Sequence, residues 1–422
     1  MADTLLGPSP SLSLLLKPLA FIPSYHSKST ISKFKCTNSS SPSLMASSSI
    51  PPPLQSSTTP PPSLLVFSGG TAFNGVVEEL KKLTTRVAHV LPVSDDGGST
   101  AEIVRVLGGP AVGDIRSRCL RLSDGSTAEA LAVRQLLGHR LPLHAKEAKS
   151  EWYDIVEGEH SLWEEVSVPY RETIRAFLVY FQQQILMRSE AKFCFSNGSI
   201  GNFFFAGARI FFQSLESAIF LFSRVSEIPK ESLILPVIST NDRLTLGCEL
   251  WDGRTIRGQN EISHPTNGLL EPVNKKHCSG QALTSRIKRV FYMSSEGQNL
   301  LHEVLNGVGE IISSRSCQKI LLLNGTYDRE TTGFSTSCFV TAITDALNRT
   351  YGNSKKCLIN PPSAYVNTIL VPRNGEIPVD LPALKDQRIF NVVTVDSLED
   401  PKVGITFDPN SLIQTLADIL RP

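Results

Sequence analysis

Two short glycine-rich segments have the composition to bind a phosphate-bearing ligand. The first, Ser68-Gly69-Gly70-Thr71, follows an apolar run from Leu64 to Phe67. Because Gly69 and Gly70 have no side chains, backbone N–H groups of this turn can face an anion, as can the start of a following helix. The segment matches neither the GxGxxG nor the Walker A pattern, so a generic glycine turn is the alternative.

The second segment, Asp95-Asp96-Gly97-Gly98-Ser99, places two adjacent carboxylates after the apolar run from Val87 to Val93. Adjacent carboxylates point in different directions, so we expect one to face the ligand and the other to support the loop. Mg²⁺ prefers one or two carboxylates together with phosphate oxygens. Asp95 and Asp96 are therefore candidate metal ligands and candidate catalytic bases. The alternatives are hydrogen bonding to an acceptor molecule and a plain structural turn.

Two further segments resemble helix starts that carry polar side chains. The segment from Gly113 to Arg118 supplies Asp114 and Arg116 at the expected ligand site. Arg118 is a further candidate for the same site. The planar fork of arginine matches phosphate, so Arg116 is a candidate catalytic residue. Ser199-Ile200-Gly201-Asn202 supplies Asn202, which can both donate and accept hydrogen bonds. Simple helix caps with exposed arginines are the alternative for both segments.

The elements that must position these residues form an alternating pattern of strands and helices. Runs 64–67 and 87–93 each end in one of the glycine-rich segments and are followed by helical periodicity. This alternation predicts an α/β fold, a Rossmann-like parallel sheet with helices on both faces. In such sheets, ligands bind just outside the carboxyl ends of the strands.

In the middle of the chain, the sequence pattern predicts a smaller cap attached to the parallel sheet. Residues 245–257 alternate like a β-hairpin turning at Asp252-Gly253, and 262–284 reads as a long loop. Helices are expected over 126–138, 170–188, 299–313, 337–347 and 411–420, and strands over 233–237, 287–292, 319–323, 368–371 and 392–395. Residues 145–164 look irregular. We expect 202–225, whose apolar run is broken by charged residues, to be a buried helical hairpin or long core helix rather than a membrane span.

Composition excludes several classes of protein. The chain has 422 residues, is 41% hydrophobic and carries a net charge of +1, so neither nucleic acid nor an anionic membrane is a favoured partner. The cysteines show no CxxC pair and the histidines no HxxxH spacing. A zinc site and a disulfide framework are therefore not expected.

Residues 1–62 differ from the rest of the chain. They are rich in serine, contain Asp3 as their single acidic residue, and end in proline clusters. Such a segment cannot bury enough apolar surface to fold and is typical of a chloroplast transit peptide with a linker. A disordered tail without targeting function is the alternative. The expected organisation is a leader over 1–62 and one α/β domain over 63–422, with the cap and inserted loop at about 140–285.

The order of the four motifs resembles the CofD/YvcK family. This family includes 2-phospho-L-lactate transferase and a UDP-sugar-binding gluconeogenesis factor, and the resemblance runs from about Leu64 to the C-terminal region. It implies that Gly69, Gly70 and Thr71 contact a phosphate-bearing nucleotide ligand. It places Asp95 and Asp96 by Mg²⁺ or a deazaflavin acceptor, Asp114 and Arg116 by the acceptor or phosphate, and Asn202 by the nucleotide.

The resemblance implies a transferase that moves a phospholactyl-type group from a nucleotide-activated donor to a deazaflavin-like acceptor. A non-catalytic protein that senses a nucleotide sugar is the alternative, so the sequence leaves open whether the chain is an enzyme. A homodimer is a possible assembly for this fold.

One departure from the family pattern concerns the second half of the chain. A strand ending in a glycine-serine loop is expected there, but the chain passes directly from 300–304 to 305–310. We therefore hypothesise that one central strand is lost near 304–305. The loss predicts exposed apolar sheet edges and an inactive variant as a further alternative.

Overall fold

The computed structural model describes residues 60–69, 71–94, 97–188, 192–263, 282–293, 299–302, 307–349, 357–401 and 403–421. All of these residues fall within one compact unit. Most of the predicted leader, together with Gly70, Asp95, Asp96 and the junction at 303–306, lies outside the described residues.

The first sheet carries the two strands that the motifs follow. Its strands are β1 (Leu64–Phe67), β2 (Val87–Leu91) and β3 (Leu233–Pro236), all parallel and in the order β1-β2-β3. Leu64 pairs with Val87, so the two strands end at the same level. The predicted parallel α/β arrangement is confirmed.

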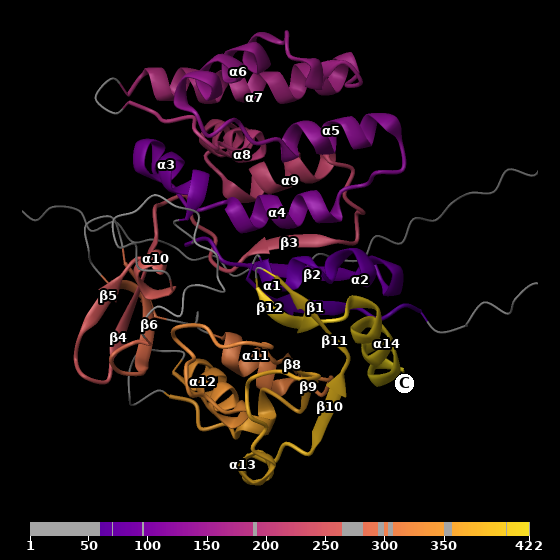
Figure 1. Cartoon of the computed structure of the whole chain (residues 1–422), viewed down its shortest axis with the longest axis vertical. Helices are drawn as coiled ribbons and strands as arrows, with labels where there is room; N and C mark the ends of the chain where they lie inside the picture. The colour runs from indigo at the N-terminus through magenta and orange to yellow at the C-terminus, as the bar shows by residue number, and fades with distance from the viewer. Residues whose placement is uncertain are drawn as a thin grey trace, which may run out of the picture. The chain divides into compact units, whose positions relative to one another are not determined.

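Helices pack against this sheet and against one another. Figure 1 shows α4, α5, α8 and α9 stacked beside it, and α4 and α9 contact β3. The helices of this half of the chain are α1 (Thr71–Asn74), α2 (Val77–Leu83), α3 (Gly98–Leu107), α4 (Gly113–Leu122), α5 (Ala128–Gly138), α6 (Ala145–Glu157), α7 (Val168–Leu186), α8 (Ile200–Phe212) and α9 (Leu215–Val225).

Two expectations about these helices have different outcomes. The helical hairpin over 202–225 is confirmed as α8 and α9, and Gln213 in the left-handed conformation ends the first of them. The irregular structure expected over 145–164 is wrong. Ala148, Trp152 and Ile155 follow helical spacing and are buried, so α6 forms there and a short 3₁₀ helix follows at Ser161–Trp163.

A second parallel sheet follows in the last third of the chain, and the strands predicted there are confirmed. It consists of β8 (Ile320–Leu322), β9 (Thr368–Pro372) and β10 (Asn391–Val395) in the order β10-β9-β8. Leu370, Val395, Leu412 and Leu416 belong to the same hydrophobic core as the first sheet. The other elements of this region are α11 (Val308–Ser314), α12 (Thr336–Asn348), α13 (Leu381–Asp386), α14 (Pro409–Leu420), the short 3₁₀ helix Pro362–Ala364, and the antiparallel pair β11 (Ser397–Asp400) and β12 (Gly404–Phe407).

The predicted hairpin is part of a small antiparallel sheet with a core of its own. The sheet contains β4 (Thr245–Leu250), β5 (Thr255–Arg257), β6 (Ile287–Met293) and β7 (Asn299–His302), and α10 (Gln259–Ser263) packs on it. Cys248, Leu250 and Ile262 form its core.

The helix expected over 299–313 is wrong at its start. Asn299–His302 pairs with β6 as a strand, and Gly307, with φ of 90°, precedes the helix, which begins at Val308.

The β1 strand lies at the edge of its sheet and carries exposed apolar side chains on one face. Within the described residues it pairs with β2 alone, and Leu65 and Phe67 are 57% and 54% exposed. The hypothesis of a lost strand predicts such an edge. The junction itself lies outside the described residues, so the hypothesis stays a prediction.

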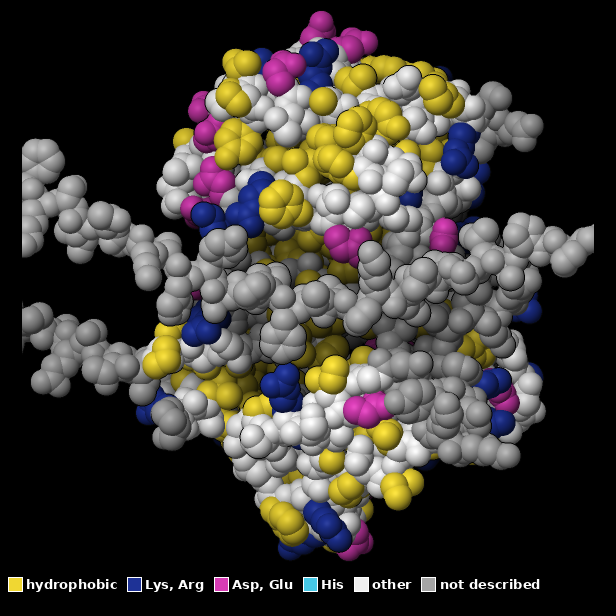
Figure 2. Space-filling view, turned by 180° about the vertical axis from the view of Figure 1, so that it is seen from behind, with side chains coloured by type: hydrophobic (Ala, Val, Ile, Leu, Met, Phe, Trp, Pro, Cys, Tyr) yellow, Lys and Arg dark blue, Asp and Glu magenta, His cyan; other side chains and the backbone are white. Residues whose placement is uncertain are grey.

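Apolar side chains also gather on the helical half of the face shown in Figure 2. Among the helices, Phe211 of α8 and Phe220 of α9 have exposed side chains. No helix in the described part of the chain combines the length and apolar character needed to cross a bilayer.

The packing of α7 against α8 depends on Gly207. A Cβ atom at this position would lie 2.1 Å from the Phe177 carbonyl oxygen. We predict that Gly207→Ala lowers the free energy of unfolding by about 1–3 kcal/mol, because the two helix backbones must separate. Gly75→Ala is the control, since a Cβ there meets nothing within 4 Å. Urea unfolding of both variants is the measurement, and equal stabilities would contradict the prediction.

Candidate functional site

The first turns of α3, α4 and α8 meet at one place. Asn202 donates through Nδ2 to Ser99 Oγ at 3.0 Å and accepts through Oδ1 from Arg116 Nε at 3.2 Å. Close approach is needed here: a Cβ on Gly113 would lie 2.9 Å from Thr100 Oγ1. Three helix N-termini therefore direct their positive dipole ends toward one region, which favours an anion. The structure thus brings Arg116 and Asn202 together, with Ser99 of the DDGGS segment.

Arg116 is a buried cation whose Nη groups have no hydrogen-bond partner among the described residues. Its side chain is 8% exposed, and it forms no ion pair with any described residue. Burial and the nearby positive charge of Arg140 lower its pKa to about 10, so it stays protonated at neutral pH. Burying a charge without a paired anion is costly. A guanidinium held in this way is prepared to bind an anionic ligand.

Arg118 lies elsewhere than expected from its place in the motif. Arg118 does not lie beside Arg116 at the expected ligand site but is fully buried. Its Nη2 donates to Ser68 Oγ at 3.2 Å and to the Gly69 carbonyl at 3.3 Å. Residues two apart on a helix face different directions, so Arg116 and Arg118 serve the two separate motifs. Arg118 connects α4 directly to the first glycine-rich segment, and Arg116 connects it to the second through Asn202.

The other predicted site residues are placed as follows. A Cβ on Gly69 would meet nothing within 4 Å, so this position faces open space. Asp114 lies in the first turn of α4 and is half-buried, and its charge acts on Arg118. Gly70, Asp95, Asp96 and the side chain of Thr71 lie outside the described residues.

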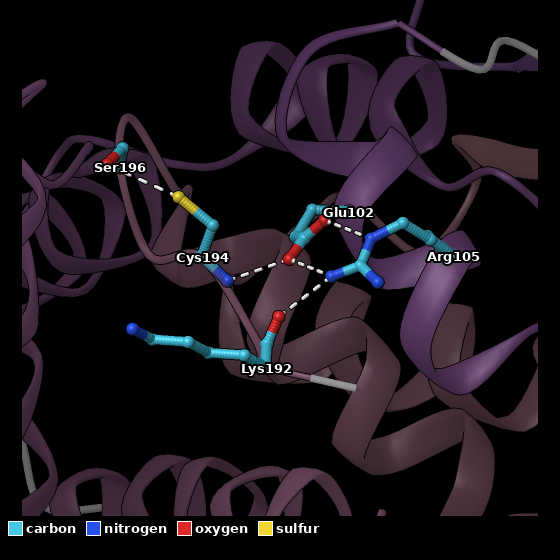
Figure 3. Close-up of polar contacts among 5 residues, drawn as sticks. All are labelled: Glu102, Arg105, Lys192, Cys194 and Ser196. Atoms are coloured by element: carbon cyan, nitrogen blue, oxygen red, sulfur yellow. Dashed lines mark hydrogen bonds and ion pairs between the residues drawn. The ribbon is translucent and has the colours of Figure 1, made fainter. Parts of the chain in front are cut away.

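A cavity of about 300 Å³ opens beside Ser99. Glu102, Arg105, Cys194 and Ser196 line it. Figure 3 shows the Glu102 carboxylate between the Arg105 guanidinium and the backbone N–H of Cys194, and both contacts are 2.7 Å long. Burial alone would raise the pKa of Glu102, but the hydrogen bonds from Arg105 and Cys194 outweigh it and lower the pKa.

Sequence reasoning missed this cavity, although one signal was available. Glu102 and Arg105 stand three residues apart on the helix that follows the DDGGS segment, which is the spacing of a helical ion pair. A larger cavity of about 600 Å³, lined by Glu79, Lys82 and residues of α14, lies away from all predicted site residues. The described residues contain no group of three or more His, Cys, Asp or Glu side chains that could hold a metal ion.

His89 is another residue that the sequence did not single out. It lies on β2, fully buried, and its Nδ1 contacts Arg118 Nη1 at 2.8 Å. Arginine can only donate, so Nδ1 accepts and the neutral ring carries its proton on Nε2. Within the described residues, this Nε2 has no hydrogen-bond partner. Burial and the Arg118 charge lower the pKa of His89 to about 3.

Comparison with known proteins gives the family context. The family model described as 2-phospho-L-lactate transferase CofD matches residues 64–409. An uncharacterized protein of Saccharomyces cerevisiae is 28% identical over 436 residues, which cover 81% of this chain and 97% of the relative.

Two crystal structures from Bacillus halodurans resemble the fold. The first, of a UPF0052 family member, has a TM-score of 0.54 and 19% identity, and the match covers 85% of this chain and 99% of that chain. The second has a TM-score of 0.55 and 19% identity, and the match covers 84% and 99%.

The buried neutral His89 makes stability depend on pH. Its pKa is 6.5 in the unfolded chain and about 3 in the fold, so between these values only the unfolded chain binds the proton. Stability is therefore full above pH 6.5 and falls as the pH decreases, with a slope of about 1.4 kcal/mol per pH unit. We predict that His89→Gln, which keeps an acceptor for Arg118, removes this slope from unfolding curves measured between pH 7 and 5. The exposed His144→Gln is the control, and parallel pH profiles of the wild type and His89→Gln would rule the effect out.

Proposed function

Because the chain belongs to the CofD family, we propose that it transfers a phospholactyl-type group from a nucleotide-activated donor to a hydroxyl of a deazaflavin-like acceptor. The observation that supports this proposal most directly is the buried Arg116 guanidinium beside three helix N-termini, with Nη donors that no described residue uses. An anion with several oxygens, such as the phosphate of the donor, matches both its charge and its geometry.

The proposed reaction assigns a role to each group. The acceptor oxygen forms a bond to the donor phosphorus, and the bond from that phosphorus to the nucleotide breaks, so the nucleotide leaves with the electron pair. The proton of the acceptor hydroxyl passes to Asp95 or Asp96. Arg116 stabilises the negative charge on the phosphate oxygens in the transition state, and Asn202 holds the Arg116 side chain through its Oδ1 atom.

We also propose that Asp95 and Asp96 hold Mg²⁺, which would neutralise phosphate charge when bound. These residues directly precede Gly97 and the first turn of α3, which contacts Asn202. The described part of the chain offers no larger group of metal ligands. Two carboxylates completed by phosphate oxygens are the ligand set that Mg²⁺ accepts.

Replacing Arg116 separates ligand binding from stability. We predict that Arg116→Met weakens GDP binding by about 10- to 100-fold, because charge-assisted hydrogen bonds to the phosphates are lost. The melting temperature should stay equal or rise, since an unpaired buried charge is removed. Calorimetric titration and thermal melts are the measurements, with exposed Arg121→Met of the same helix as the control.

Three results would contradict the Arg116 assignment or the transferase proposal. The first is unchanged GDP affinity of Arg116→Met, which removes this residue from the phosphate site. The second is a large loss of stability together with the loss of binding, which would make Arg116 structural. The third is wild-type binding of UDP-sugars without product from any donor, which would favour a nucleotide-sugar sensor over a transferase.

The carboxylate pair has its own test. We predict that Asp95→Asn abolishes the Mg²⁺-dependent part of GDP binding, because the substitution removes a negatively charged oxygen ligand. Titrations with GDP in the presence of Mg²⁺ and of EDTA measure this part directly. If the affinity of Asp95→Asn still responds to Mg²⁺ as the wild type does, Asp95 is not a ligand of the ion.

A further inference from the structure

The guanidinium of Arg118 lies beneath the Ser68–Gly69 turn and connects it to three other elements. Nη2 donates to the side chain of Ser68 and to the carbonyl of Gly69. Nε donates to Asn74 Oδ1 at 3.2 Å, and Nη1 donates to His89 Nδ1 at 2.8 Å. One side chain of α4 therefore holds the end of β1, the short helix after it, and β2. The turn cannot shift away from Arg118 without breaking the two hydrogen bonds that Nη2 donates to it.

All four acceptors of Arg118 are neutral. Hydroxyl, carbonyl, amide and imidazole groups satisfy its hydrogen bonds, and it forms no ion pair within the described ranges. The ring of Phe73 lies 5.2 Å from the guanidinium carbon, which adds a cation–π contact. Burial lowers the pKa of Arg118 to about 10, while the nearby Asp114 charge raises it, so the side chain is charged at neutral pH.

His89 accepts a hydrogen bond from Arg118 without neutralising the positive charge of its guanidinium. A carboxylate at this position would accept the same hydrogen bond but would cancel the charge of the guanidinium. The neutral imidazole accepts the bond and leaves the positive charge in place. The charge lies in a medium of low polarity, where its field at the turn is screened less than in water.

We propose that Arg118 is a positioning residue for the phosphate of the ligand: it holds the Ser68–Gly69 turn and keeps a positive charge beneath it whose hydrogen-bond acceptors, among the described residues, are all neutral. This inference rests on the proposed function, which supplies the anionic ligand. Arg116 and Arg118 then act from opposite sides of α4, the first through its unused donors and the second through the turn that it fixes.

The test uses the full chain, with inorganic pyrophosphate as the probe and hydrogen exchange of the unliganded protein as the second readout. Arg118→Met should increase amide exchange within residues 64–76 at least tenfold and weaken pyrophosphate binding at least tenfold. Exchange in α5 should not change. Arg118→Lys should recover part of the affinity, because it keeps the charge, but not the protection, because it lacks the planar fork.

Two further variants separate charge from position. His89→Glu should keep the turn protected, because the carboxylate still accepts from Arg118, yet weaken pyrophosphate binding at least tenfold. It keeps the test decisive if Arg118→Met does not fold. Arg121→Met is the matched control, since it removes an exposed charge near Arg118 without a contact to the turn, and it should leave both readouts unchanged.

The inference is overturned if Arg118→Met leaves exchange in residues 64–76 unchanged, or if it raises exchange in α5 equally, which would be a general loss of stability. It is also overturned if His89→Glu binds pyrophosphate as the wild type does, or if the wild type does not bind pyrophosphate. Failure of the proposed function gives a different result. Pyrophosphate binding would then depend on Arg118, but no transfer from a nucleotide-activated donor would be detected.

Discussion

The free-energy cost of burying guanidinium charge without a contacting carboxylate in the described part of the chain is the constraint on which the site depends. Arg116 and Arg118 are both almost entirely buried, and the hydrogen bonds that hold them go to neutral acceptors. Such groups lower stability unless something else compensates. Here the compensation comes from polar partners on four surrounding elements and from the core that fixes those elements. The remaining positive potential is available to a ligand.

The helical layer supplies the rigidity that this arrangement needs. Phe203, next to Asn202 on α8, stacks on Phe181 with ring centroids 4.7 Å apart and contacts Trp152 edge-on at 5.0 Å. Aromatic clusters of this kind bury large areas and hold one geometry. Gly201 allows α8 to lie against α5 and Arg116, since a Cβ there would be 2.4 Å from the Leu137 carbonyl oxygen. The position of Asn202, and through it that of the Arg116 fork, therefore follows from core packing.

Local patterns predicted most of the elements, and the family resemblance assigned Arg116 and Asn202 to one ligand site; the hydrogen bond between them is a finding of the structure. They could not predict the partner of Arg118. His89 lies in the middle of a strand and follows no recognised motif, so its contact with Arg118 depends on how α4 crosses β2. The start of the helix predicted over 299–313 failed for a related reason. Pairing with β6, a long-range interaction, decides the structure of Asn299–His302.

The open edge of β1 bears on the lost strand. Exposed apolar strand edges favour pairing with another chain, and proteins usually cover them. The alignment with the yeast relative extends over 436 residues, more than the 422 of this chain, although only 81% of this chain is aligned. The relative therefore contains segments without a counterpart here, and one more strand beside β1 would pair with its open backbone edge. The Arg118 network does not need that strand, because all its described acceptors lie on β1, β2 and the segments that directly follow β1. A chain without the strand can thus keep the turn that Arg118 holds while lacking whatever part of the fold the strand would complete.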